Sequence, residues 1–307
     1  MENNIFKEKI VIGIDHGYGN MKTRNSTFKS GVKAFGGETP VAGDVLVLNG
    51  NHYTIGENHK VYISNKNEDD DYYILTLAAI ARELDARVVG TDVEVILAVG
   101  LPLHWIGQQK DDFKKYLMRN EMVEYTFCNK LYRIKICDVA VYPQGYAGIA
   151  ASIKDYSGMH MLADIGNGTM NTMVIVNGKP VSDKMYTDLL GVHQCVIALR
   201  NEVQAKCGKL PDEMLIEEYL RFAVTDVSEK MMEVMRVQAE KYVATIFGRL
   251  SEYGYDPELV KLHIIGGGGC LVRNFGSYDP VRVKIIEDIR ATAKGYENLY
   301  LKLGRGA

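Results

Sequence analysis

The sequence predicts an α/β protein made of two related domains, and three observations support this prediction. The chain has 307 residues, which is enough for about two domains of ordinary size. Apolar runs of strand length alternate with segments of helical periodicity. One nine-residue motif also occurs twice, 149 residues apart: Asp15–Thr23 and Asp164–Thr172 share Asp, Gly, Gly, Met and Thr at equivalent positions.

Composition narrows the range of functions. There are 36 Lys and Arg against 39 Asp and Glu, a net charge of −3, so a strongly basic nucleic-acid-binding surface is not expected. The five cysteines include no Cys-x-x-Cys pair, which argues against a disulfide framework or a structural zinc site. No apolar run reaches the roughly 18 residues that a membrane helix needs. We therefore expect a cytoplasmic protein with no membrane contact and no direct DNA binding.

The first half of the chain is predicted to be rich in strands. An apolar strand at Lys9–Ile14 is followed by a glycine-rich turn and a hairpin partner at Met21–Phe28. The turn-forming pair Asn49-Gly50 predicts a hairpin between residues 44–48 and 52–55. Further on, Tyr72–Ala86 has helical periodicity, and Val93–Gly100 is an apolar run typical of a strand buried on both faces. The remaining elements are a helix at 104–119, strands at 124–127 and 132–142, and a helix from 145 to about 155.

The second half repeats the opening pattern and then adds helices. A buried strand at Met159–Asp164 is followed by a glycine turn and a strand at Met170–Val176, and Asn177-Gly178 starts a hairpin onto 179–186. Helical periodicity is found at 192–206, 212–222 and 228–252. The last predicted elements are a strand at 261–265 that runs into Gly266–Gly269, a strand at 281–286 and a helix at 287–301.

The repeated motif predicts one hairpin in each half, with an Asp-x-Gly-x-Gly tip. Glycines at such a turn let backbone N–H groups approach an anion closely, so two of these turns on facing domains can hold a polyphosphate. The residues proposed to contact phosphate are Gly17, Tyr18, Gly19 and Asn20 in the first turn, and Gly166, Asn167, Gly168 and Thr169 in the second.

The carboxylates at the start of the two turns would repel bound phosphates, because both groups are negatively charged, so a cation is needed beside them. Asp15 and Asp164 are suited to orient a hydrated Mg²⁺, which prefers to keep its water ligands. Lys22 lies where the returning strand brings its ammonium group back to the phosphates. We therefore predict Asp15 and Asp164 as metal-orienting residues and Lys22 as a phosphate-binding residue.

A third glycine segment and one glutamine complete the candidate site. Gly266, Gly267, Gly268 and Gly269 stand between a predicted strand and helix, a further place for close backbone approach to a ligand. Leu271 takes the position of the last glycine of a dinucleotide fingerprint, and the chain has no P-loop sequence. Gln144 follows a strand end, and its amide can orient a water in line with a γ-phosphate.

These segments resemble motifs of the actin/Hsp70/sugar-kinase superfamily. Ile14–Lys22 resembles the phosphate-1 motif, Leu162–Thr169 the phosphate-2 motif, Ile264–Gly269 the adenosine motif, and Gln144–Gly148 and Ala291–Tyr296 the two connecting motifs. The five occur in the order of the superfamily and span nearly the whole chain. The chain looks most similar to bacterial plasmid-segregation actins of the ParM/StbA type.

The resemblance implies an actin-like (ribonuclease H-like) fold, with two related domains around a nucleotide cleft and a small insertion in each. It implies ATP, with GTP as the alternative, together with Mg²⁺, and hydrolysis by Gln144, Asp15 and Asp164 as catalytic residues. It also implies polar filaments of the chain that move plasmid DNA through a DNA-bound adaptor protein. Hydrolysis would weaken subunit contacts and make the filaments dynamic.

The predicted bounds follow the repeat. Domain I is expected at 1–157, with an insertion at about 30–75 and a C-terminal helix at 286–307 that completes it. Domain II is expected at 158–285, with a small helical insertion at about 208–227. A small-molecule kinase of the same superfamily is the alternative function, although the chain shows no substrate motif. An Hsp70-like binding module is less expected because no substrate-binding domain follows residue 301.

Overall fold

The computed structural model describes residues 9–35, 43–57, 70–102 and 105–303, and the chain divides into two compact units. Unit 1 is formed by residues 1–151 and 290–307, and unit 2 by residues 152–289. Each unit has its own sheet and its own hydrophobic core. The predicted α/β class is therefore confirmed. Of the expected insertion at 30–75, residues 36–42 and 58–69 lie outside the described part.

Unit 1 is built on a mixed sheet. Within the described ranges its order is β3-β2-β1-β7-β9-β8-β5-β6-β4. The strands are β1 (Lys9–His16), β2 (Asn20–Lys22), β3 (Thr27–Lys29), β4 (Val32–Phe35), β5 (Asp44–Leu48), β6 (Asn51–Ile55), β7 (Asp92–Leu101), β8 (Met122–Phe127) and β9 (Lys130–Pro143). The helices are α1 (Asp71–Ala86), α2 (Ile106–Leu117), α3 (Tyr146–Ile149) and α8 (Ala291–Leu303).

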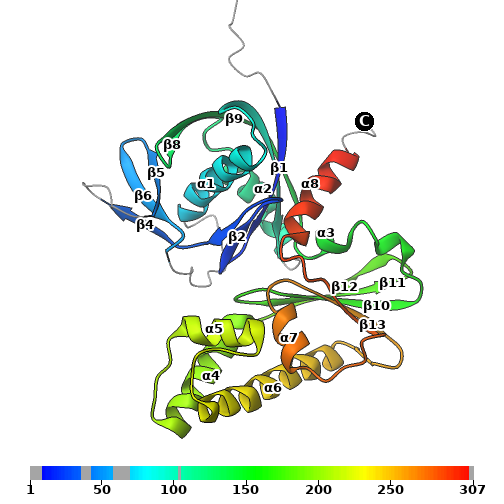
Figure 1. Cartoon of the computed structure of the whole chain (residues 1–307). Coiled ribbons are helices and arrows are strands. Elements are labelled where there is room, and N and C mark those ends of the chain that lie inside the picture. The colour runs from blue at the N-terminus through cyan, green and yellow to red at the C-terminus, as the bar shows by residue number, and fades with distance from the viewer. Residues whose placement is uncertain (1–8, 36–42, 58–69, 103–104, 304–307) are drawn as a thin grey trace, which may run out of the picture. The chain divides into compact units, whose positions relative to one another are not determined.

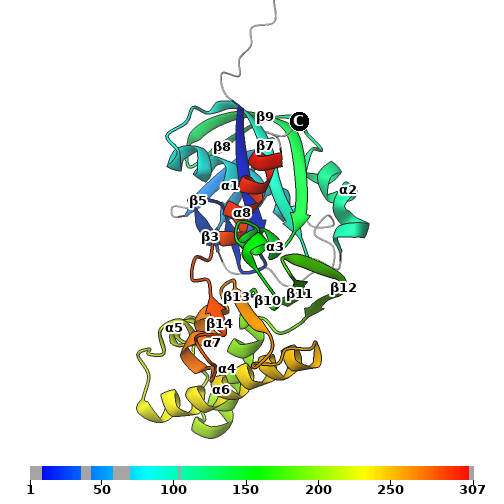
Figure 2. The ribbon, with the colours of Figure 1, turned by 90° about the vertical axis from the view of Figure 1, so that its right-hand side faces the viewer.

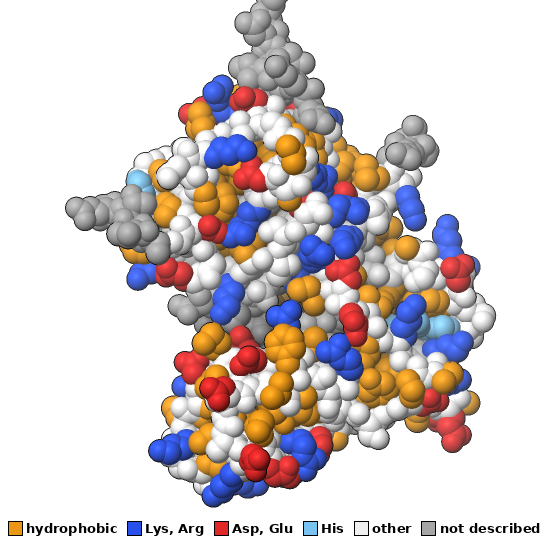
Figure 3. Space-filling model, viewed as in Figure 1, with side chains coloured by type: hydrophobic (Ala, Val, Ile, Leu, Met, Phe, Trp, Pro, Cys, Tyr) orange, Lys and Arg blue, Asp and Glu red, His pale blue; other side chains and the backbone are white. Residues whose placement is uncertain are grey.

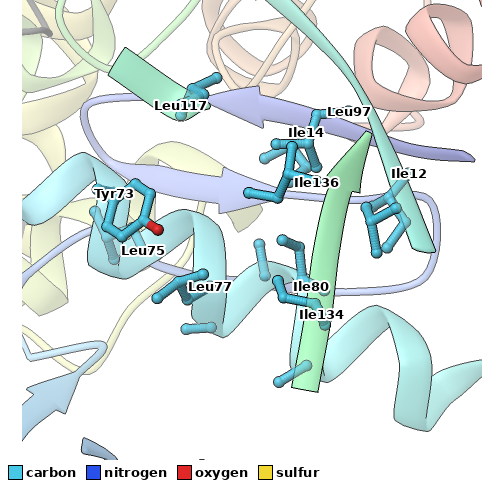
Figure 4. Close-up of a cluster of buried hydrophobic side chains, with 14 of the residues drawn as sticks. Ile12, Ile14, Tyr73, Leu75, Leu77, Ile80, Leu97, Leu117, Ile134 and Ile136 are labelled. Atoms are coloured by element: carbon cyan, nitrogen blue, oxygen red, sulfur yellow. The ribbon is translucent and has the colours of Figure 1, made fainter. Parts of the chain in front are cut away.

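Helices cover both faces of the central strands of unit 1. Because side chains alternate along a strand, Ile12 and Ile14 of β1 and Leu97 of β7 join the core formed with α1 (Figure 4). On the other face Ala98 of β7 packs with Tyr296 of α8. Figure 1 shows α1 beside the sheet, and Figure 2 shows α8, in red, in front of β1 and β7. The central strands are thus buried on both sides, as their apolar runs predict.

Unit 2 has a smaller sheet in the order β12-β11-β10-β13-β14. Its strands are β10 (Met159–Ile165), β11 (Met170–Val176), β12 (Lys179–Asp188), β13 (Lys261–Ile265) and β14 (Val283–Ile285). Its helices are α4 (Val192–Cys207), α5 (Glu213–Phe222), α6 (Glu229–Glu252) and α7 (Gly269–Phe275), with a 3-10 turn at Ile153–Asp155. Helices α4, α6 and α7 bury one face of the sheet (Figure 1). None of the described helices is both long and apolar enough to cross a membrane.

The two sheets share one core arrangement. In unit 1, β1 has the antiparallel neighbours β2 and β3 on one side and the parallel strands β7 and β9 on the other. In unit 2, β10 has β11 and β12 on one side and β13 and β14 on the other, with the same directions. The sequence repeat therefore corresponds to a repeated sheet.

Two predicted elements differ in kind from the structure, and the helix predicted at 287–301 begins at Ala291. The strand predicted at 21–28 is two short strands, β2 and β3, because residues 23–26 form a turn in which the N–H of Thr23 donates to the carbonyl of Ser26 at 2.9 Å. The helix predicted from 145 to 155 is the single turn α3 followed by a 3-10 turn. Its Ala- and Gly-rich sequence offers little apolar surface, and helices of this kind depend on such a surface for stability.

A buried histidine pair lies on the face of unit 2 opposite its helices. Nδ1 of His160 on β10 and Nε2 of His263 on β13 are 2.8 Å apart, and the Tyr156 ring stacks on both imidazoles with centroids at 4.4 Å. Burial lowers the pKa of His263 to about 4, with smaller contributions from the neighbouring His160 ring and from the positive charges of Lys284 and Lys261. Burial also lowers the pKa of His160. Both rings are therefore neutral at neutral pH.

Unit 2 should lose stability as the pH falls. On unfolding the two histidines regain a pKa of about 6.5, so below this pH the unfolded chain binds protons that the folded chain excludes. Between about pH 7 and about pH 5 we expect the free energy of unfolding to fall by about 2 kcal/mol through this pair, measured by urea unfolding followed by circular dichroism. His263→Gln should reduce this loss, whereas His193→Gln on α4 should not. An unchanged loss in His263→Gln would contradict the assignment.

Candidate functional site

Three predicted site residues of unit 1 meet at one end of its sheet. Asp15 is only 4% exposed, and its Oδ2 accepts a hydrogen bond from Nζ of Lys22 at 3.1 Å. Its Oδ1 accepts one from Nε2 of Gln144 at 3.2 Å. A buried carboxylate and two partly buried groups, an ammonium and an amide, thus form one cluster.

The directions of the strands explain why these residues meet. Strands β1, β7 and β9 are parallel, so their carboxyl ends lie at the same edge, where ligands of α/β sheets bind. Gln144 directly follows β9, and its backbone N–H donates to the carbonyl of Leu101 at the end of β7 at 2.8 Å. Strand β2 runs antiparallel to β1 and places Lys22 opposite Asp15. The cluster is therefore a consequence of the sheet topology.

The predicted turn residues Gly17, Tyr18, Gly19 and Asn20 connect β1 to β2, and Asn20 is the first residue of β2. Ser30 holds this turn from the end of β3: its hydroxyl donates to the carbonyl of Tyr18, and its N–H donates to the carbonyl of Gly19 at 3.1 Å. The turn therefore has a defined conformation within unit 1 itself.

The sequence assigned no role to His16, and the structure shows that it belongs to the core. Its ring is buried, with Nε2 at 2.9 Å from Oγ1 of Thr76 on α1. Its edge packs on Phe113 of α2, with ring centroids 5.4 Å apart. Alternation along β1 points His16 away from the side of Asp15. His16 thus anchors the start of the turn to the helices.

The second hairpin repeats the first in unit 2. Asp164, 6% exposed, pairs with Asn171, and Ile165 pairs with Met170. This is the register of Asp15 with Lys22 and of His16 with Met21, shifted by the repeat distance. The predicted residues of the turn are Gly166, Asn167, Gly168 and Thr169, and the N–H of Gly166 donates to the carbonyl of Thr169 at 2.8 Å.

The glycine segment lies directly against this second hairpin. Gly266 follows β13, which is parallel to β10 and places Ile265 opposite Asp164. Gly266 has a φ of +88°, and a Cβ there would lie 2.6 Å from the carbonyl oxygen of Ile165 and 2.7 Å from Oδ1 of Asp164. The N–H of Gly268 donates to the same carbonyl at 2.9 Å, and Gly269 begins α7. The structure thus brings the two predicted phosphate-binding segments of unit 2, residues 166–169 and 266–269, into contact. Gly267 lies in the second segment, shortly before α7.

Sequence reasoning missed one segment that supports the second turn. At the start of α4 the N–H of Val192 donates to the carbonyl of Gly166 at 3.0 Å, and the N–H of His193 donates to that of Asn167 at 2.9 Å. Backbone N–H groups in the first turn of a helix have no partner inside the helix, so they are available for this purpose. Gly191 marks the helix start in the sequence, but its contact with a hairpin more than twenty residues away is tertiary.

The donor set fits a magnesium ion held through water. Among the described residues, no three or more His, Cys, Asp or Glu side chains cluster as metal ligands. Mg²⁺ in phosphate sites keeps several waters and takes one or two carboxylates, so single buried carboxylates such as Asp15 and Asp164 suit it. Beside Oδ1 of Asp164 the backbone approaches so closely that position 266 has no room for a Cβ.

Gly266→Ala should destabilise unit 2. An L residue at this positive φ is strained by about 1–2 kcal/mol, and the added methyl group would overlap the carbonyl of Ile165. We expect the free energy of unfolding to fall by about 2 kcal/mol or more in urea unfolding. Gly267→Ala is the matched control, because a Cβ there meets no atom within 4 Å. Equal stability of the two variants would contradict this packing.

Comparison with known proteins supports the fold. Residues 13–146 match the family described as actin like proteins N terminal domain. The sequence matches no curated protein.

Solved structures are similar over nearly the whole chain. Ta0583, an archaeal actin homologue, has 19% identity over 95% of this chain and 99% of its own, with a TM-score of 0.76. Its complex with ADP has a TM-score of 0.74 at the same identity and coverage. A 15-stranded ParM filament from Clostridium botulinum has 16% identity over 96% and 100% of the two chains, with a TM-score of 0.75. The apo ParM protein of pSK41 has 14% identity over 98% and 99%, with a TM-score of 0.70. The chain therefore has the fold of actin-like proteins, and its residues 13–146 resemble the N-terminal domain of that group.

Proposed function

We propose that the chain binds ATP with Mg²⁺, hydrolyses the nucleotide and forms filaments whose dynamics depend on hydrolysis. The observation that carries this proposal is the cluster of the buried Asp15 with Lys22 and Gln144 at the carboxyl ends of parallel strands. Two similar proteins add support, since Ta0583 was solved with ADP and the Clostridium botulinum ParM as a filament.

Each residue of the cluster has a role that its chemistry allows. Lys22 neutralises phosphate oxygens, and the glycine turns supply backbone N–H donors. Asp15 and Asp164 hold Mg²⁺ through water, and the ion neutralises charge on the phosphates. Because Nε2 of Gln144 donates to Asp15, its Oε1 is the atom that accepts a hydrogen bond from the attacking water and orients it.

We further propose that the filaments segregate plasmid DNA in the cytoplasm and reach it through a DNA-binding adaptor protein. The net charge of −3 gives little attraction to phosphate backbones. On α6 of unit 2 the arginines are paired with acids: Arg236 with Glu233 and Glu240, and Arg249 with Glu252. Figure 3 shows the resulting mixture of blue and red side chains over α5 and α6.

The test is nucleotide-dependent assembly of the purified chain. Light scattering, electron microscopy and phosphate release are measured with ATP, GTP, ADP or no nucleotide. We expect filaments with a triphosphate and Mg²⁺, and their decay as phosphate is released. Asp164→Asn should lower phosphate release by about a hundredfold while circular dichroism stays unchanged, because a metal-orienting charge is lost.

Asp183→Asn on exposed β12 makes the same charge change outside the site and should hydrolyse ATP normally. Normal phosphate release by Asp164→Asn would refute the site. Transfer of phosphate to a small metabolite, without filaments, would instead support the kinase alternative.

Gln144→Ala should separate nucleotide binding from hydrolysis. The chain should still bind ATP, because the turns and Lys22 remain, but phosphate release should fall by about a hundredfold when the water loses its orienting amide. Filament lifetime, followed by light scattering after ATP is depleted, should increase. Gln108→Ala, an exposed amide on α2, is the matched control. Reduced hydrolysis with unchanged filament lifetime would show that hydrolysis does not control disassembly.

A further inference from the structure

Buried charges hold the turn between β2 and β3, which directly follows Lys22. The turn consists of residues 23–26 and already closes on its own backbone hydrogen bond. A turn of this type ordinarily lies in solvent and needs no buried partner. Here two carboxylates and a guanidinium lie behind it: Glu83 on α1, Arg87 directly after α1, and Glu297 on α8, which we call the turn clamp.

Glu83 accepts three hydrogen bonds from the turn. Its side chain is fully buried, and its carboxylate accepts from the hydroxyl of Thr23. It also accepts from the backbone N–H of Asn25 at 3.1 Å and from the side-chain amide of Asn25 at 2.7 Å. Burial alone would raise the pKa of Glu83, but the hydrogen bonds from Thr23, Arg87 and Asn25 outweigh it and lower the pKa. Glu83 is therefore charged at neutral pH.

Arg87 and Glu297 connect the turn to the first strand and the last helix. Arg87 donates from Nε to Glu83 and from Nη2 to Glu297, both at 2.7 Å. Its Nη1 donates to the carbonyl of Val11 on β1 at 3.1 Å. Oε1 of Glu297 in turn accepts from Nε of Arg24 in the turn at 2.8 Å. The turn clamp thus joins α1, α8 and β1 to one four-residue turn.

The strand that carries Lys22 is short, and its contact with the hydrophobic core is the buried side chain of Met21. Strands β2 and β3 have three residues each, and β3 is the edge of the sheet. Two residue pairs join β2 to β1, one of which is Lys22 with Asp15. A lysine side chain has many rotamers, so the place of its ammonium group depends on a well-held backbone. The turn clamp fixes the backbone at Thr23, the residue that follows Lys22.

We propose that Glu83 is a positioning residue: by holding Thr23 and Asn25 it sets the place of the Lys22 ammonium group beside Asp15, and through it the affinity for the phosphates of the nucleotide. The nucleotide part of this role rests on the proposed function. The position of the Lys22 side chain does not depend on the proposed function, and it can be measured separately.

Thr23→Val tests the role with little change in volume. Valine removes the hydroxyl that donates to Glu83 and keeps the shape of the side chain, whereas Thr23→Ser keeps the hydroxyl and is the matched control. One readout is the rate at which acetic anhydride modifies Lys22, relative to the exposed Lys115, measured by mass spectrometry. The second readout is KM and kcat for ATP hydrolysis.

In Thr23→Val we expect modification of Lys22 to rise several-fold. We expect KM for ATP to rise about tenfold and kcat to change less than about threefold, because a displaced lysine weakens phosphate binding in the ground state and the transition state alike. Thr23→Ser should behave as the unchanged chain does. Unchanged modification of Lys22 in Thr23→Val overturns the proposal, and so does a loss of kcat with KM unchanged, which a merely structural role would give.

Two further outcomes are also decisive. Raised modification of Lys22 in a chain that never hydrolyses nucleotide overturns the proposed function but supports the positioning role. Should Thr23→Val fail to fold, Asn25→Ala removes an exposed side chain that donates to Glu83 at 2.7 Å. It should raise Lys22 modification and KM in the same direction, and the absence of both changes overturns the proposal.

Discussion

A buried carboxylate is costly unless partners surround it, and Asp15 imposes this requirement on unit 1. One of its oxygens accepts from Lys22 on β2 and the other from Gln144 after β9. The lengths and pairing of β1, β2 and β9 must therefore bring Asp15, Lys22 and Gln144 to the same place. A shift of β2 by one residue would turn Lys22 to the other face of the sheet and leave the carboxylate without its ammonium partner. The register of the sheet therefore determines which side chains meet in the site.

Unit 2 uses the same hairpin with a different electrostatic arrangement. Asn171 takes the position that Lys22 has in unit 1, and its side-chain oxygen accepts from the hydroxyl of Thr187 at 2.8 Å. In place of an ammonium group, the glycine segment that begins at Gly266 lies against Asp164. One repeated backbone therefore carries a cationic side chain beside its aspartate in unit 1 and a glycine segment beside it in unit 2. Both suit a phosphate, but only the first adds a full positive charge.

Local patterns predicted most of the fold because strands and helices here follow their own periodicity. Strands β11 and β13 have the predicted bounds, and the repeat distance also predicts which residues pair across both hairpins. The prediction failed at residues 21–28, where Glu83, 60 residues from Thr23 in sequence, holds a turn. Motifs indicated Asp164 and Gly266 separately, but their contact exists only because β10 and β13 are neighbours. What sequence reasoning missed was tertiary contact between distant segments.

The last helix of the chain determines how firmly the first hairpin is held. Gly13 in the middle of β1 lies so close to the carbonyl of Ala293 in α8 that a Cβ would overlap it. This approach brings Oε2 of Glu297 to 3.4 Å from the N–H of Gly13 and within reach of Arg87. A larger residue at position 13 would push α8 away from the sheet and separate Glu297 from the rest of the turn clamp. The place of Lys22 therefore depends on a glycine in the preceding strand and a glutamate near the end of the chain, neither of which belongs to a phosphate-binding turn.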